Sequence, residues 1–98
     1  MHLLLVASSP KKLRDILGLS KAAVMQKHNV TIFFNEDSVQ LIKKGSSVGA
    51  LYANLLACRA SARDFGIEQE HLVENARMSS LSELVELLEK SDRVVFLG

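Results

Sequence analysis

Short runs of consecutive apolar residues alternate along this chain with segments in which apolar residues recur every three or four positions. Residues 3–7 form such a run, which is typical of a strand buried on both faces of a parallel sheet. Ser9 and Pro10 then suit the start of a helix, and apolar residues at helical spacing extend it over residues 13–24. Residues 30–34 are β-branched or aromatic and predict a second strand. A strand, a helix and a strand in this order indicate a right-handed βαβ unit with parallel strands.

The middle of the chain is harder to assign from its pattern. Residues 39–44 predict a short helix capped by the preceding polar residues 35–38 and closed by Gly45. In residues 48–57 the apolar positions follow a helical period, whereas the alternation of strands and helices on either side favours a strand over residues 54–57. The residues alone leave both alternatives open.

The last third of the chain predicts two more strands with a helix between them. Residues 72–77 form a fourth strand of poor propensity, which we expect to be short or at an edge. Ser80 to Glu83 is a capping box, and it starts a helix with one apolar face formed by Leu81, Leu84, Val85 and Leu88. Residues 93–97 form the fifth strand. The expected fold class is α/β, with a five-stranded, mostly parallel sheet flanked by helices.

Composition narrows the function classes. A chain of 98 residues is expected to form a single domain over residues 1–98. Its formal net charge of +1 and its lack of Trp argue against nucleic acid as a partner. No stretch approaches the roughly 18 apolar residues of a membrane span, so we expect no membrane partner. One cysteine cannot form an internal disulfide, which favours a reducing, cytoplasmic location.

The only cysteine, Cys58, is the main candidate for chemistry. It follows the apolar residues 55–57, and Arg59 and Arg63 lie close to it in the sequence. If the chain turns there from strand to helix, the thiol lies at the carboxyl end of a strand, where α/β proteins collect functional groups. Positive charge beside it would stabilise a thiolate or persulfide anion. The alternative is structural, because most lone cysteines are small, buried, apolar side chains.

Other candidate sites are weaker. The three histidines have no partner at metal-ligand spacing, so no metal is expected. No dinucleotide-binding fingerprint follows the first strand, and no cofactor is expected. Glu36 and Asp37 follow the second strand and could act as acid or base catalysts of a hydrolase or transferase, although helix capping also accounts for them.

Four segments of the chain resemble the DsrE/DsrF-like superfamily of sulfur-relay proteins, which includes TusD-like subunits. The segment SSPKKL after the first strand resembles the family's first βα unit, and VTIFFNEDSVQLIKKG resembles its second strand, polar turn and helix. ACRASARDFGI resembles the cysteine segment, and MSSLSELVELLEKSDRVVFL resembles the last helix and strand. Together these segments extend over nearly the whole chain.

This resemblance implies a three-layer α/β sandwich, flavodoxin-like in character, that assembles as a homo-oligomer and has a strand ending near Ala57. It also implies that Cys58 accepts sulfur as a persulfide from a donor protein and passes it to an acceptor protein. Arg59 and Arg63 are the candidate anion stabilisers because of their positions next to Cys58. The chain would then be a sulfurtransferase. The alternative hypothesis is a non-enzymatic assembly or small-molecule-binding module of the same fold, in which Cys58 is structural.

Overall fold

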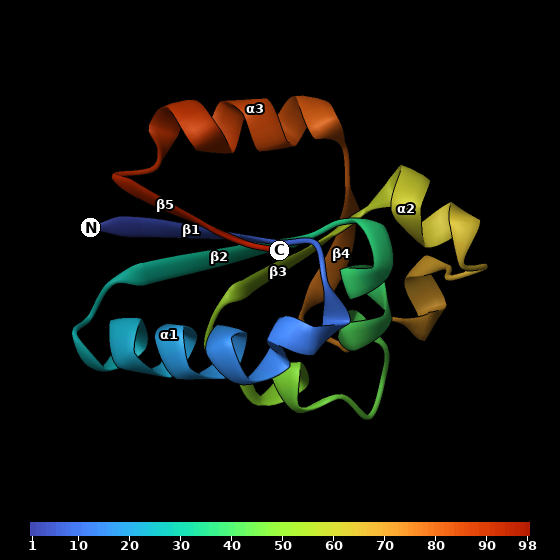
Figure 1. Ribbon diagram of the computed structural model, residues 1–98, viewed down its shortest axis with the longest axis horizontal. Helices are drawn as coiled ribbons and strands as arrows, with labels where there is room; N and C mark the ends of the chain where they lie inside the picture. Colours follow the sequence, from blue (N-terminus) through green and yellow to red (C-terminus); the bar gives the residue numbers. More distant parts are fainter.

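The computed structural model describes all 98 residues and contains one five-stranded sheet (Figure 1). Every pair of neighbouring strands is parallel. The spatial order is β4-β3-β2-β1-β5, where the strands are β1 (His2–Ala7), β2 (Asn29–Phe34), β3 (Asn54–Cys58), β4 (Ala76–Ser79) and β5 (Arg93–Leu97). The expected α/β class is therefore confirmed, with a sheet that is parallel throughout.

Helices cover both faces of the sheet because the chain reverses its direction across the sheet once. From β1 to β4 each strand is added on the same side of the previous one, and right-handed crossovers then place the connections on one face. That face carries α1 (Leu13–Met25), which a short 3-10 helix, η1 (Pro10–Lys12), precedes. From β4 the chain returns across the whole sheet to β5, so α3 (Leu81–Lys90) lies on the opposite face (Figure 1).

The remaining connections are short. They consist of the 3-10 helices η2 (Glu36–Ile42), η3 (Ser47–Ala50) and η4 (Gln69–His71), and of the six-residue helix α2 (Arg59–Asp64) after β3. None of the helices is long and apolar enough to cross a membrane.

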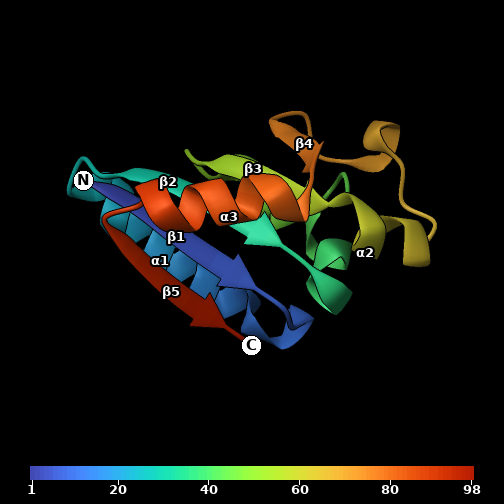
Figure 2. The ribbon, with the colours of Figure 1, turned by 90° about the horizontal axis from the view of Figure 1, so that it is seen from above.

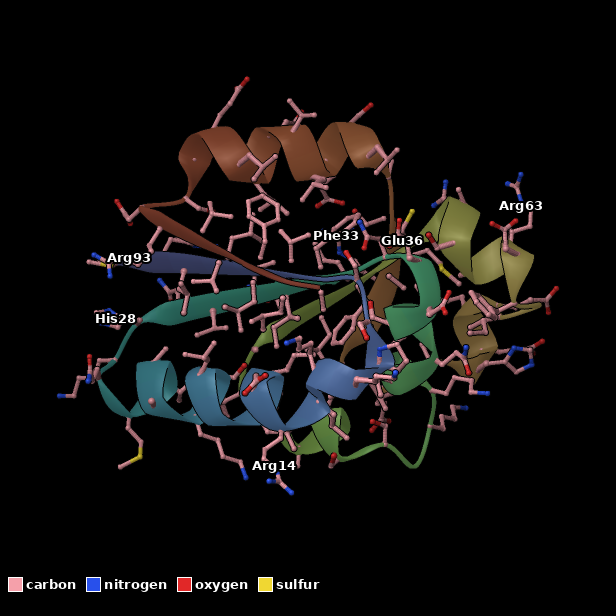
Figure 3. The ribbon with its side chains drawn as sticks, in the orientation of Figure 1. Arg14, His28, Phe33, Glu36, Arg63 and Arg93 are labelled. Carbon is pink, nitrogen blue, oxygen red and sulfur yellow. The ribbon has the colours of Figure 1, made fainter.

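The sheet separates two apolar clusters of unequal size (Figure 3). The larger cluster has 18 buried residues and includes Ile16 and Ala23 of α1. The smaller cluster has five buried residues on the α3 face, and Leu84, Leu87 and Val94 pack against it. Its members are Leu4, Val6, Phe33, Leu56 and Cys58. A single ten-residue helix is the only helical cover on that face, which explains why its cluster is smaller.

The structure resolves the ambiguous middle segment and corrects two boundaries. Residues 54–58 form a central strand, because their apolar side chains are buried on both faces of the sheet. The helix predicted over residues 39–44 is instead the 3-10 helix η2, and the Ser38 hydroxyl within it donates to the Ala7 carbonyl at 2.7 Å. The fourth strand covers residues 76–79 rather than 72–77, because the Val73 amide donates to the Ile42 carbonyl at 2.9 Å instead of pairing in the sheet. Its position at an edge is confirmed.

The predicted apolar face of the last helix is only partly covered by the sheet. Leu84 and Leu87 pack on the sheet, whereas Leu81, Val85 and Leu88 are 57%, 53% and 37% exposed. The apolar arc of α3 is wider than the contact that one helix makes with a sheet, so part of the arc is left in solvent.

Candidate functional site

Cys58 lies where the strand alternative for residues 54–57 predicts, at the carboxyl end of β3. It is the last residue of that strand and also the N-cap of α2, with an extended backbone (φ −61°, ψ 118°). In the sheet it is paired with Ser79, the last residue of β4. The apolar strand ends at Cys58 because exposed, polar residues follow it and begin the helix.

The thiol is covered. Cys58 is 4% exposed and belongs to the apolar cluster on the α3 face of the sheet. Leu84 and Leu87 of α3 pack against this cluster. A sulfur anion at this position therefore needs a movement that brings water or a cation to it.

The structure does not bring the two predicted arginines to the thiol. Arg59 and Arg63 are exposed and line a hollow of about 340 Å³ together with Met78, and Cys58 is not among the lining residues. Met78 packs against the larger cluster, so this hollow lies towards the other face of the sheet from the Cys58 side chain. Arg63 points away from the sheet into solvent (Figure 3).

A charged network that sequence reasoning missed holds the start of α3 beside Cys58. Arg77 of β4 binds Glu83 with both terminal nitrogens, one of them 3.0 Å from Oε1, and the Ser79 hydroxyl donates to the same carboxylate. Hydrogen bonds from Arg77 and then from Ser79 lower the pKa of Glu83 to about 2. The predicted capping box showed that Glu83 belongs to a helix start, but only half of the box forms. The Ser80 hydroxyl accepts from the Glu83 amide at 3.2 Å, whereas the Glu83 carboxylate binds Arg77 and Ser79.

Glu36 and Asp37 line a separate hollow of about 460 Å³ at the carboxyl ends of β1 and β2. Glu36 has a left-handed backbone, with φ at +50°, and its amide donates to the Ser61 hydroxyl of α2 at 2.8 Å. Asn35 does not cap η2 as expected, because its side-chain oxygen accepts from Ser8 at 2.8 Å. The two carboxylates are on the same end of the sheet as Cys58, but Cys58 does not line their hollow.

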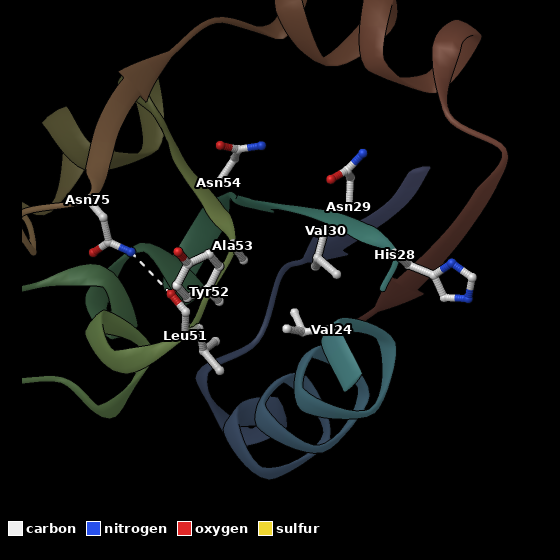
Figure 4. Close-up of a pocket in the computed structure, with 9 residues that line it drawn as sticks. All are labelled: Val24, His28, Asn29, Val30, Leu51, Tyr52, Ala53, Asn54 and Asn75. Carbon is white, nitrogen blue, oxygen red and sulfur yellow. Dashed lines mark hydrogen bonds between the residues drawn. The ribbon is translucent and has the colours of Figure 1, made fainter. Parts of the chain in front are cut away.

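A further hollow, of about 420 Å³, lies at the amino ends of the strands (Figure 4). Val24, Val30 and Leu51 form its apolar part, and Tyr52 is 88% exposed beside it. The Asn75 side chain donates to the Leu51 carbonyl at 3.4 Å. None of the residues that line the hollow is Asp, Glu, Lys or Arg. Because its residues come from α1, β2, β3 and three loops, no local sequence pattern could have predicted it.

One group of side chains could hold a metal ion, against the expectation from the sequence. Glu68, Glu70 and His71 place one ligand atom each within 4.8 Å of one another, and all three are exposed. The His71 Nδ1 already accepts from the Glu68 amide at 2.9 Å, which closes a capping box on η4. The spacing Glu-x-Glu-His in residues 68–71 is the sequence signal that could have identified the group.

Two solved structures share this fold over nearly their whole length. They are the ychN protein from E. coli, at 15% identity, and MTH1491 from Methanobacterium thermoautotrophicum, described as a protein of unknown function, at 11% identity. Each has a TM-score of 0.74, and the matches cover 98% and 97% of this chain and 97% and 96% of those chains. No curated protein sequence matches this chain. A sequence model of the DsrE/DsrF-like family matches residues 1–97, and the chain therefore belongs to that family.

Proposed function

We propose that this protein is a sulfur-relay protein that carries a persulfide on Cys58, receives it from a donor protein and passes it to an acceptor protein. The observation that supports this is the place of the thiol, at the carboxyl end of a central strand and at the N-cap of the helix that follows. Membership of the DsrE/DsrF-like family supports it as well. The functional unit in this proposal is a homo-oligomer.

The proposed step needs no cofactor. The Cys58 thiolate attacks the outer sulfur of a persulfide on the donor, a new sulfur–sulfur bond forms, and the donor's own sulfur–sulfur bond breaks. The donor leaves as a thiolate, and Cys58 then carries the persulfide. No net oxidation occurs, because one sulfur–sulfur bond replaces another.

The burial of Cys58 requires a local opening before this step. The cover consists of the side of α3 that carries Leu84 and Leu87, and the start of α3 is held to β4 by Glu83. Moving the start of this ten-residue helix would expose the thiol without unfolding the sheet. Arg59 and Arg63 are exposed, long side chains, and in the opened state they would be the cations that hold the persulfide anion.

A specific observation favours a second candidate, a non-enzymatic binding or assembly module in which Cys58 is structural. The thiol is 4% exposed within an apolar cluster, as a packing residue would be. In that case the uncharged hollow lined by Leu51 and Tyr52 is the candidate binding site for a small, uncharged, partly apolar molecule.

Thiol labelling of the native protein separates the two candidates. A local opening slows labelling of Cys58 by about 10- to 1,000-fold relative to the unfolded chain, and low concentrations of urea leave the rate unchanged. A structural thiol is labelled only on global unfolding, which costs about 5–15 kcal/mol, so it reacts more slowly still and its rate rises steeply with urea. The variant Glu83→Gln should raise the labelling rate in the first case only, with Glu86→Gln as the matched control on the exposed side of α3.

Sulfur transfer itself is tested by mass spectrometry after incubation with a cysteine desulfurase and cysteine. We expect one added sulfur atom on Cys58 and none in the Cys58→Ser variant. Arg59→Gln and Arg63→Gln should shorten the lifetime of the persulfide. Absence of added sulfur on the wild-type protein, together with labelling that follows global unfolding, would leave only the structural candidate.

A further inference from the structure

The α3 face of the sheet has an apolar surface that nothing in the chain covers. It consists of Leu81, Val85 and Leu88 of α3 and Phe96 of β5, which is 68% exposed. We call these four residues the α3–β5 corner. In the view from above, β5 lies uncovered beside α3 (Figure 2).

The geometry of α3 turns this exposed arc towards β5. Successive residues in a helix are about 100° apart, so Leu81, Val85 and Leu88 lie within about 60° of one another. Glu83, on the other flank of the helix, binds Arg77 on β4, at the opposite edge of the sheet from β5. Because the sheet-facing residues lie between these two flanks, the exposed arc must point towards the β5 side.

Phe96 completes the corner from the sheet. Val94 packs against the cluster under α3, and side chains two positions apart on a strand share a face, so Phe96 projects on the same side of the sheet as α3. It lies near the carboxyl end of β5, the end at which α3 begins with Leu81. β5 is also an edge strand that pairs only with β1.

We propose that the α3–β5 corner is the surface through which two copies of this chain associate, with α3 of each copy packed antiparallel to α3 of the other about a two-fold axis near Val85. This inference rests on the self-association in the proposed function and not on the sulfur chemistry. Each copy then supplies the second helix that the thin layer over the sheet lacks.

The sequence of α3 suits a second copy in this orientation. A two-fold axis that passes between residues 84 and 85, next to Val85, brings Leu81 of one copy opposite Leu88 of the other, so the apolar stripe is complementary to itself. Glu89 is in the last turn of α3, where the negative end of the helix dipole disfavours a carboxylate. In this arrangement it lies near the positive N-terminus of the partner helix instead. A parallel arrangement would instead place the two Glu89 carboxylates together, which is unfavourable.

Sedimentation velocity over a range of protein concentrations tests the proposal. We expect the wild-type protein to sediment as at least two copies of 10.8 kDa. Val85→Glu places two carboxylates at the two-fold axis and should weaken association at least about 100-fold. Met25→Glu is the matched control, because Met25 is also exposed and apolar but lies at the end of α1 on the opposite face. It should leave the mass unchanged.

Two further variants keep the test decisive if Val85→Glu disturbs folding. Glu89→Lys leaves the apolar stripe intact and should weaken association, whereas Glu86→Lys, which is turned further from the corner, should not. Val85→Cys in a Cys58→Ser background should form a disulfide between two copies on mild oxidation.

A monomeric wild-type protein at about 100 μM would overturn the inference. Dimers that persist in both Val85→Glu and Glu89→Lys would also overturn it, because association would then use another surface. Persulfide loading of Cys58 in the wild-type protein distinguishes the two proposals, since it would remain if only the interface assignment failed.

Discussion

Replacing Glu83 by Gln tests how the start of α3 is held to the sheet. Glu83 accepts hydrogen bonds from Arg77 and Ser79 of β4, and its own amide donates to the capping Ser80. The substitution keeps the shape and the helix propensity of the side chain while it removes the charge. It should therefore weaken the contacts with Arg77 and Ser79 and leave the backbone cap in place.

The magnitude follows from the pKa of the carboxyl group. A pKa lowered from 4.5 to about 2 corresponds, at 1.36 kcal/mol for each pH unit, to about 3 kcal/mol of stability at pH 7. The Arg77 side chain is 58% exposed, so water screens the pair. We expect Glu83→Gln to lower the free energy of unfolding by about 1 kcal/mol.

The effect should depend on pH with a definite sign. Because folding lowers the pKa of Glu83, the ionised group stabilises the protein above pH 4.5, and this contribution disappears as the pH falls to about 2. Urea unfolding of wild type and variant at pH 7, 4 and 3 should show a difference that narrows as the pH is lowered. Glu86→Gln, on the exposed side of the same helix, should change little. Equal effects of the two substitutions at pH 7, or a difference independent of pH, would refute the reasoning.

Three further substitutions test the backbone and the core, each measured by urea unfolding at pH 7. Lys27 has φ at +64° after the end of α1, so Lys27→Gly should stabilise the protein by about 1 kcal/mol, whereas Lys21→Gly inside the helix should destabilise it by about the same amount. Phe33 is fully buried under α3, so Phe33→Ala should cost about 3–5 kcal/mol, and Phe65→Ala, at a side chain 43% exposed, much less. The buried Ser20 hydroxyl has no hydrogen-bond partner, so Ser20→Ala should stabilise by about 1 kcal/mol, and no gain would mean that the hydroxyl is satisfied.

The order of strands and helices could be predicted because it follows from the local pattern of apolar and polar residues. Runs of apolar, β-branched and aromatic residues, such as residues 3–7 and 30–34, favour strands covered on both faces of the sheet, and the N-cap at Ser80 sets where α3 begins. The apolar positions of residues 48–57 recur at helical spacing and wrongly suggest a helix. A short apolar strand buried between two layers of helices has the same composition as a buried helix, so the spacing alone cannot separate the two. There the tertiary structure decides, since only a strand can fill the place between β2 and β4.

For the candidate site as well, some properties follow from the sequence and others only from the tertiary structure. The sequence by itself determined that a helix begins just after Cys58, because an apolar run changes there to small and polar residues, but it left open whether that run is a strand. Only the tertiary structure decided that the thiol is covered, that Arg59 faces a different hollow, and that Glu83 meets Arg77. Each of these depends on which face of the sheet a side chain leaves and on the return of α3 across the sheet. Such relations join residues that are distant along the chain, and no local pattern of apolar and polar positions encodes them.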